Sequence, residues 1–338
     1  MLRFSFRLLV RASVLGGILC AQALPLLAAP LAGAPPTQAA TPGEDGGQSA
    51  HVFGGRVELG LAHEVTHANE IKLGNGPVLL LPGDRMRKAD TYRHLEAGTD
   101  ITVPCGAQLN CVANASVDSR TGARSSEFDT GIAEAGAGMQ YTAGTVVYGV
   151  RAGRQQWQVG GQSFRRVNNL VGDAVMAFGE QLSAYASVEM SRYAHPGDNA
   201  FLDADYRALT GNLRWATNNK WQSVYTVQAT VSREDNRQQD PSLDLRGVFV
   251  RLSWEAKPAE RWTLQPAFMV QTLRYGGVDP VFGVQRNELF TQIEFVAHYK
   301  ISEKLKWRFE LMRARYHSNA EAINNDWSSV GTGLRWEF

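Results

Sequence analysis

Residues 327–338 alternate along their whole length between two kinds of side chain. Apolar and aromatic residues gather on one side, ending in Leu334, Trp336 and Phe338, while small or charged residues such as Gly333 lie between them. A repeat of two indicates a β-strand, because successive side chains of a strand point to opposite faces. One face of this strand is apolar, and lipid or another layer of protein must cover it.

The same alternation recurs along most of the chain. In 289–301, one face holds Leu289, Ile293 and Phe295. The other face holds polar residues such as Glu294, together with Phe290 and Val296. Further alternating segments begin near Val52, Trp221, Gly247, Trp262, Gln285 and Leu305. A soluble sandwich would cover these apolar faces with a second sheet, whereas a membrane barrel covers them with lipid.

The connections between these segments favour the barrel, because short and long connections follow one another. The short connections are 218–219, 257–260 and 301–303. The longer connections are polar, and they are 195–202, 237–242, 276–284 and 318–326. The sequence therefore predicts an all-β fold, a transmembrane antiparallel up-and-down β-barrel of about 14 strands with short periplasmic turns and longer extracellular loops.

Two details of this barrel are also predicted. Tryptophans at strand ends predict aromatic girdles at both membrane interfaces, and they are Trp215, Trp221, Trp254, Trp262, Trp307, Trp327 and Trp336. Residues 66–89 are expected to form the longest loop. Its apolar piece, 78–81, either packs on the rim or folds inward over the lumen.

The start of the chain has the layout of a secretory signal peptide. Three arginines precede an apolar run over 12–27, and small residues follow it. We expect a signal peptide over 1–29 with cleavage between 29 and 40, a disordered lead-in over 30–51, and the barrel over 52–338; a membrane-spanning helix is the alternative for the first segment. An exported barrel is expected in the outer membrane of a Gram-negative cell.

Composition narrows the classes of partner. The formal net charge is +1, which argues against a nucleic-acid partner, since such proteins carry a basic surface. The mean hydropathy is −0.25, which a transmembrane barrel shares with soluble proteins because only alternate residues meet lipid. Nothing in the sequence calls for a cofactor.

Two cysteines remain after the expected signal peptide. Cys105 and Cys111 are close in sequence, and an exported chain folds in an oxidising compartment, so we predict a disulfide within a periplasmic turn. A metal pair and two free thiols are the alternatives, but a metal site needs further ligands, and none lies nearby in the sequence.

The polar faces of the strands predict the lining of the lumen. The predicted lumen residues are Arg214, Arg251, Glu288, Glu294, Arg308, Glu310 and Arg335. Both signs of charge are interspersed, and about fourteen strands enclose more space than side chains alone can fill. The charges fit either a polar passage or docking surface, or a network of ion pairs that seals and rigidifies the barrel.

Catalysis is not predicted. The seven histidines are scattered, and a hydrolase would need a serine, a histidine and an orienting group within hydrogen-bond reach. His317 and Ser318 are adjacent in sequence, which does not bring them face to face on a strand. His63 and His67 form too small a set of ligands to indicate a metal site.

Three short pieces resemble the barrel of the surface lipoprotein assembly modifiers, the Slam family. They are 276–286, 316–319 and the ending 333–338. The resemblance implies an assembly signal of Gly333, Leu334, Trp336 and Phe338, whose final aromatic the barrel-insertion machinery reads. It also implies a secreted protein or lipoprotein client, besides contact with outer-membrane lipid.

The sequence departs from this family in two places. Asn287 stands where an acid often follows the arginine, and the low-complexity stretch before the barrel is too short for the helical repeat domain that usually precedes it. A separate periplasmic partner is one consequence. The leading hypothesis is a Slam-like barrel that assists translocation or surface display of a large substrate. A porin-type solute channel and a structural or adhesive barrel are the alternatives.

Overall fold

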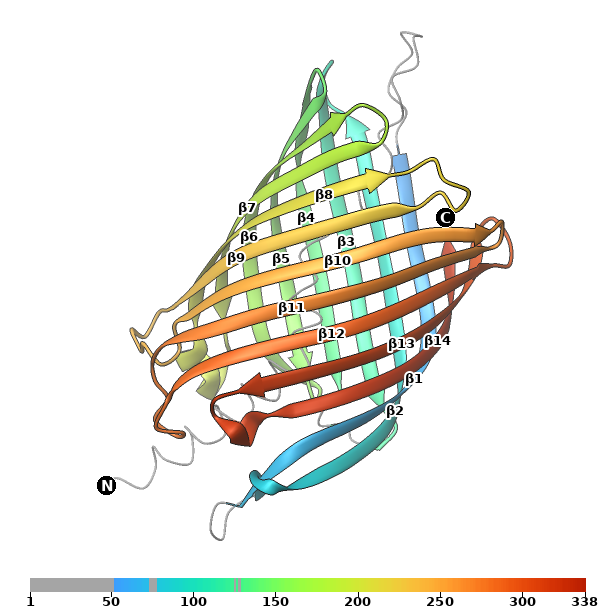
Figure 1. Ribbon diagram of the computed structural model, residues 1–338. Coiled ribbons are helices and arrows are strands. Elements are labelled where there is room, and N and C mark those ends of the chain that lie inside the picture. Colours follow the sequence, from blue (N-terminus) through green and yellow to red (C-terminus); the bar gives the residue numbers. More distant parts are fainter. Residues whose placement is uncertain (1–51, 73–77, 125, 127–128) are drawn as a thin grey trace.

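A computed structural model describes residues 52–72, 78–124, 126 and 129–338. In this part of the chain, fourteen antiparallel strands form one closed barrel in which every strand pairs with its sequence neighbours and β1 pairs with β14 (Figure 1). The predicted fold class is confirmed. The predicted signal peptide at 1–29 and lead-in at 30–51 lie outside the described residues and stay predictions.

The strands are long enough to cross a bilayer at a tilt. Their bounds are β1 Val52–Lys72, β2 Val78–Pro104, β3 Leu109–Gly122, β4 Thr130–Ala143, β5 Val146–Val159, β6 Gln162–Phe178, β7 Leu182–Ala194, β8 Ala204–Ala216, β9 Val224–Asn236, β10 Leu245–Ala259, β11 Trp262–Val278, β12 Gln285–Lys300, β13 Leu305–Ser318 and β14 Asn325–Glu337. Two short 3-10 turns, η2 (Gly197–Leu202) and η3 (Glu321–Ile323), lie in the connections.

The outer face of the barrel is apolar along most strands. Ile293 is 63% exposed, Leu59 60% and Leu213 54%, although each is a large hydrophobic residue in a regular strand. The residues between them point inward and are mostly polar or small. An exposed apolar belt of this kind is stable only in hydrocarbon, so the barrel spans a membrane. No helix in the described part of the chain is long and apolar enough to cross one.

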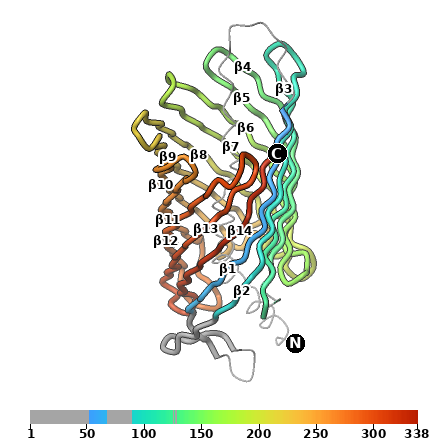
Figure 2. The backbone as a smooth tube through the Cα atoms, turned by 90° about the vertical axis from the view of Figure 1, so that its right-hand side faces the viewer, coloured from blue at the N-terminus to red at the C-terminus, as the bar shows by residue number. Residues whose placement is uncertain are grey.

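The barrel closes where β14 lies beside β1 (Figures 1 and 2). The closing register pairs Val57 with Trp336 and Leu59 with Leu334, so apolar side chains face outward on both strands. Phe338 extends this pairing, because it and Gly55 exchange two backbone hydrogen bonds of 2.9 and 3.0 Å. Residues from opposite ends of the described chain therefore depend on each other for closure.

Deleting Phe338 is expected to lower assembly of the barrel in the outer membrane several-fold. Its ring lies 4.8 Å from that of Trp336 and 5.9 Å from that of Phe53, and it crosses Gly55, where a Cβ atom would come within 2.5 Å of the ring. Removing it exposes the edge of the closing pair, and unpaired edges favour misassembly. The heat-modifiable folded fraction in isolated outer membranes measures the effect, with Phe338→Tyr as the conservative control. Unchanged assembly would contradict the proposed assembly signal.

The connections follow the predicted short and long alternation with three exceptions. The periplasmic turn predicted at 218–219 is longer than expected, because β8 ends at Ala216 and β9 begins at Val224. At the extracellular end, β5 and β6 join through a tight turn at Gly160 and Gly161, both with positive φ, which permits the compact hairpin turn that glycine favours. The prediction of one long loop over 66–89 is wrong for most of its length. β1 continues to Lys72 and β2 starts at Val78, so the strands extend past the barrel wall; the side chains of 78–81 lie outside the description.

The aromatic residues form one girdle, at the periplasmic end, rather than the two predicted. Pairs of rings join neighbouring strands there, with centroids 5.7 Å apart for Trp215 and Tyr225 and 5.1 Å apart for Trp262 and Tyr299. Trp327 is the exception among the predicted tryptophans, because it lies at the extracellular end, points inward and is 5% exposed against Phe290. The alternation of β14 places Trp327 on the inner face. Its position near a strand end does not show which face it occupies.

The predicted disulfide is present. Cys105 and Cys111 are bonded with Cα atoms 5.8 Å apart, and they bracket the turn between β2 and β3 at the periplasmic end. Backbone hydrogen bonds from Cys105 and Gly106 to the carbonyl oxygen of Leu109 close the same turn. The bridge therefore supports a hairpin that the backbone already forms.

Candidate functional site in the lumen

The seven residues predicted to line the lumen all occupy inward positions. They share strand faces with buried residues such as Thr210 on β8 and Phe290 on β12, and they alternate with the exposed apolar belt. The structure divides them among separate parts of the wall. Arg308, Glu310 and Arg335 lie at the closing seam.

Glu58 on β1 is the centre of the seam network and was not among the predicted lumen residues. Its side chain is 1% exposed. One carboxylate oxygen accepts from Arg308 Nη1 at 3.0 Å, and the other accepts from Arg335 Nε at 2.7 Å. Arg308 also contacts Glu310 at 2.6 Å. A single buried carboxylate thus ties β1 to β13 and β14, which are the strands that close the barrel.

Small residues let Arg308 reach across one strand. Gly333 on β14 lies directly between Arg308 on β13 and Gly60 on β1. A Cβ atom at Gly333 would meet the backbone oxygen of Leu59 at 2.7 Å. The missing side chains leave a path over β14, so a guanidinium from β13 can pair with Glu58 on β1. The alternation of β14 predicts that Gly333 faces inward, but only the register explains why a glycine stands there.

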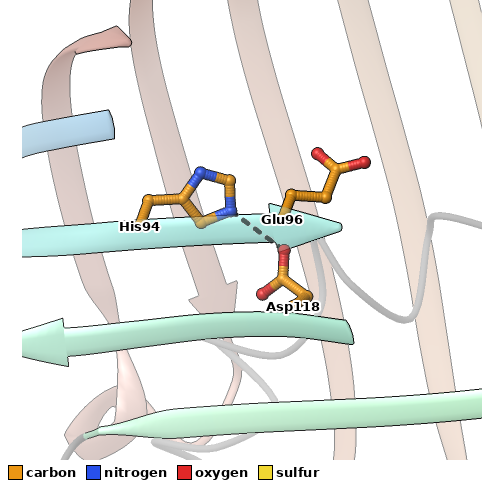
Figure 3. A group of neighbouring side chains, drawn as sticks. All are labelled: His94, Glu96 and Asp118. Carbon is orange, nitrogen blue, oxygen red and sulfur yellow. Dashed lines mark hydrogen bonds and ion pairs between the residues drawn. The ribbon is translucent and has the colours of Figure 1, made fainter. Parts of the chain in front are cut away.

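The network continues on the other side of β1, where His94, Glu96 and Asp118 lie together on β2 and β3 (Figure 3). Arg56 Nη2 lies 2.6 Å from Glu96, and His94 Nε2 lies 2.9 Å from Asp118 across β2 and β3. The side chains of His94, Glu96 and Asp118 lie close enough to hold a metal ion. All three already have partners, since Glu96 pairs with Arg56 and His94 pairs with Asp118. Ion pairing and hydrogen bonding account for this group.

A second polar group lies at the extracellular rim and contains Glu288. Tyr316 OH donates to Glu288, and Arg286 Nε lies 3.6 Å from Glu288 and 3.4 Å from Asp279. The Arg286 guanidinium carbon stands 3.8 Å from the centre of the Tyr275 ring. Asp279 also accepts backbone hydrogen bonds within the β11–β12 loop, from Val281 N at 2.8 Å. The group therefore fixes the loop to the wall.

The remaining predicted residues lie between these groups or apart from them. Arg251 Nη2 is 3.8 Å from Glu294, a pair that crosses β11. Arg214 points inward near the periplasmic end of β8, between Ser183 and Thr226. Among the residues that the structure describes, Arg214 has no carboxylate partner, so its charge is available to the aqueous lumen.

A loop beside the rim is held by a buried histidine. The backbone N–H of His195 donates to Asp203 Oδ1 at 2.6 Å, and its ring packs edge-on against Phe164 at 5.4 Å. Burial, together with the nearby charge of Arg165, lowers the pKa of His195 to about 4. The imidazole is therefore neutral at neutral pH and serves as a packing group of the β7–β8 connection.

The charged side chains follow the wall of the barrel. Every ion pair among the described strand residues joins side chains of one strand, of neighbouring strands, or of strands with one other between them. On the far side from the seam, Asp173 lies over Gly149, where a Cβ atom would come within 2.7 Å of Oδ1. None of these pairs connects opposite walls.

No pair of a serine and a histidine side chain stands out as catalytic in the described part of the chain. Ser318 is 1% exposed on the inner face, whereas His317 is exposed on the outer face. His63 Nδ1 is 3.0 Å from Thr91 Oγ1 on the outer face, and His67 Nδ1 is 3.1 Å from Asp326. His63 and His67 therefore each contact a different residue, and the two contacts do not converge on one nucleophile.

No protein-family model matches the sequence, and no curated protein matches it at a significant level. Solved structures do match the fold. The outer-membrane channel DcaP of Acinetobacter baumannii is similar with a TM-score of 0.53 at 10% identity, covering 85% of this chain and 97% of that chain. An anion-selective porin from Comamonas acidovorans has a TM-score of 0.45 at 11% identity, covering 86% and 99%. The described chain thus has the fold of a Gram-negative outer-membrane β-barrel, and its apolar belt places it in that membrane.

Proposed function

We propose that the protein is a passive channel for small polar solutes with a weak preference between cations and anions. The observation that supports this best is that the lumen charges pair along the wall and not across it. Such pairs make the wall rigid and hydrophilic, which a water-filled passage needs. Both signs alternate around the wall, so neither sign of solute is strongly attracted or excluded.

Single-channel recording in planar bilayers tests this proposal. The purified barrel is expected to give a large, stable open current in KCl, with a reversal potential close to zero under a salt gradient. A barrel that stays closed under all applied voltages would overturn the channel and favour a structural or adhesive barrel that presents its loops.

Replacing Arg214 by glutamate is expected to raise the permeability of cations relative to anions severalfold. The charge of Arg214 is unpaired among the described residues and faces water. In water, the interaction energy between a unit charge and a passing ion ~4 Å away is about 1 kcal/mol. Reversal potentials in a KCl gradient measure the ratio. Arg166→Glu is the matched control, because Arg166 is exposed on the outer face of β6 and the same change of charge there leaves the lumen unaltered. Equal shifts for both variants would contradict the assigned facing.

A Slam-like role in the translocation of a lipoprotein or other large client is a second proposal. One observation favours it: two of the pieces that resemble the Slam family come together at the extracellular rim. Asn319, from the second piece, donates to Gln285 O within the first piece at 2.9 Å and accepts from Asn287 N, just after that piece, at 2.8 Å. Under this proposal the barrel works with a separate periplasmic partner and, during its own assembly, with the barrel-insertion machinery. Loss of a surface-exposed client after gene deletion, restored by the intact gene, would support it.

A further inference from the structure

Four arginines form a row across the outer face of the barrel. Direct cross-strand neighbours are Arg207 on β8 with Arg233 on β9, Arg233 with Arg246 on β10, and Arg246 with Arg274 on β11. All four side chains are exposed. They share the outer face with the apolar belt, and the next outward residue toward the periplasm is Leu209, Val231, Val248 or Thr272, in strand order.

This row is unfavourable for the barrel alone. Like charges directly opposite each other in a sheet repel and destabilise it. Arg233 has one carboxylate partner, Asp235, at 2.6 Å. Within the described residues, Arg207, Arg246 and Arg274 form no ion pair. Three of the four arginines therefore carry positive charge that no ion pair within the described residues neutralises, at the edge of a surface that contacts lipid.

The row also borders a cavity. A cavity of about 400 Å³ lies at the extracellular ends of β9, β10 and β11, and its lining includes Arg233, Arg246 and Arg274. Three acidic residues also contribute to the lining: Glu234, Asp235 and Asp244. Asp235 is occupied by Arg233, and Asp244 Oδ1 accepts from the backbone N–H of Asn236 at 2.8 Å. Glu234 follows Arg233 in a regular strand, so its side chain points to the opposite, inner face.

The loop between β9 and β10 gives the cavity its upper wall. Gly276 N donates to Asp244 O at 2.9 Å, and a Cβ atom at Gly276 would come within 2.9 Å of Pro241 O. The lack of a side chain at Gly276 lets the loop settle against the end of β11. The loop therefore lies against the end of β11 beside the cavity, and the arginine side chains stay exposed.

We propose that this row binds the phosphorylated headgroup of a glycolipid in the outer leaflet of the membrane. Phosphate oxygens would accept paired hydrogen bonds from Arg246 and Arg274, a geometry that planar guanidinium groups suit. The acyl chains would lie along Leu209, Val231 and Val248 below. An amphipathic anion is favoured over a soluble one because the charges and the apolar belt are continuous.

The two edges of the belt support this occupant. The periplasmic edge carries the aromatic girdle, for example Trp221 against Trp254 at 5.9 Å, which is typical of an ordinary phospholipid interface. The extracellular edge carries the arginine row in the same strands, β8 to β11. An outer membrane has phospholipid in its inner leaflet and phosphorylated glycolipid in its outer leaflet. The aromatic edge of the belt therefore meets phospholipid, and the arginine row meets the phosphorylated glycolipid.

Binding of lipid A by the detergent-solubilised full barrel tests the proposal by native mass spectrometry. Wild-type protein is expected to retain diphosphorylated lipid A more tightly than the monophosphorylated form. The double variant Arg246→Gln/Arg274→Gln should bind the diphosphorylated form at least about tenfold more weakly, since a charge-assisted hydrogen bond is lost at each position. Arg154→Gln/Arg166→Gln is the matched control, because both residues are exposed on the outer face of neighbouring strands without charged cross-strand neighbours.

Three results would overturn the proposal. One is equal affinity of wild type and the Arg246/Arg274 variant, and another is an equal loss in the matched control. The third is displacement of lipid A by millimolar inorganic phosphate, which would indicate a site for free phosphate. Because the double variant relieves repulsion, its unfolding midpoint without lipid should not fall, and added lipid A should raise the midpoint of the wild type only. A variant that changes the oligomeric state without changing lipid binding would identify a second copy of the chain as the occupant and reject the lipid.

Discussion

Replacing Glu58 by glutamine is expected to lower the free energy of unfolding of the barrel by about 3 kcal/mol. This is the lower end of the range for breaking a buried ion pair by removing one partner. The carboxylate is 1% exposed and accepts from two arginines, so its loss leaves Arg308 and Arg335 close together at the seam. The loss stays at the lower end because Arg308 keeps Glu310 at 2.6 Å. Urea titration in lipid vesicles, followed by tryptophan fluorescence, measures the change.

Glu337→Gln is the matched control for this prediction. Glu337 pairs with Lys306 at 2.7 Å on the same seam, but the two side chains are 37% and 32% exposed. Exposed pairs contribute at most about 1 kcal/mol. Equal losses for the two variants would show that burial of Glu58 does not govern closure of the barrel.

Replacing Ile293 by arginine is expected to reduce folding into lipid far more than replacing its neighbour Glu294 by arginine. Ile293 is 63% exposed on the outer face in the middle of β12, where arginine costs about 2–4 kcal/mol in a bilayer. Glu294 faces the lumen, where water solvates an added charge, and the substitution breaks only two long contacts, with Arg251 at 3.8 Å and with Gln292 at 3.5 Å. The folded fraction after dilution into vesicles, read from heat-modifiable mobility on gels, compares the two variants.

The opposite order, or equal defects, would place Ile293 in a protein-covered environment and contradict a lipid-facing belt. Phe309→Arg offers an independent check, because Phe309 lies on the outward face of β13, where it pairs with Thr332 of β14. It should behave as Ile293→Arg does. Stable folding of the wild type in detergent-free buffer would undermine both predictions at once.

Much of the fold followed from alternation alone. Residues 289–301 and 327–338 show which side chains face lipid and which face the lumen, because a strand has only two faces. The inward position of Arg308 and Arg335 was predicted for this reason. The predicted turn with Cys105 and Cys111 also agrees with the structure, since close spacing and export both favour a bridge.

Other features depended on distance between strands that no local pattern encodes. Glu58 was not among the predicted lumen residues, and only the register of β1 against β14 brings it to Arg335. Trp327 was placed in an aromatic girdle because a strand end predicts an interface, yet it is buried against Phe290 on the inner face. The tight turn at Gly160 and Gly161 also broke the expected rhythm of long extracellular loops.

The sequence by itself determined that the chain forms strands with one apolar face. The reason is that the alternation of apolar and polar residues involves only residues close together in the sequence. Tertiary structure alone decided which residues meet across strands: Glu58 with its two arginines, and Arg207, Arg233, Arg246 and Arg274 in one row. The physical reason is that register sets cross-strand neighbours. Register is fixed by closure of the whole sheet, to which every strand and every connection contributes.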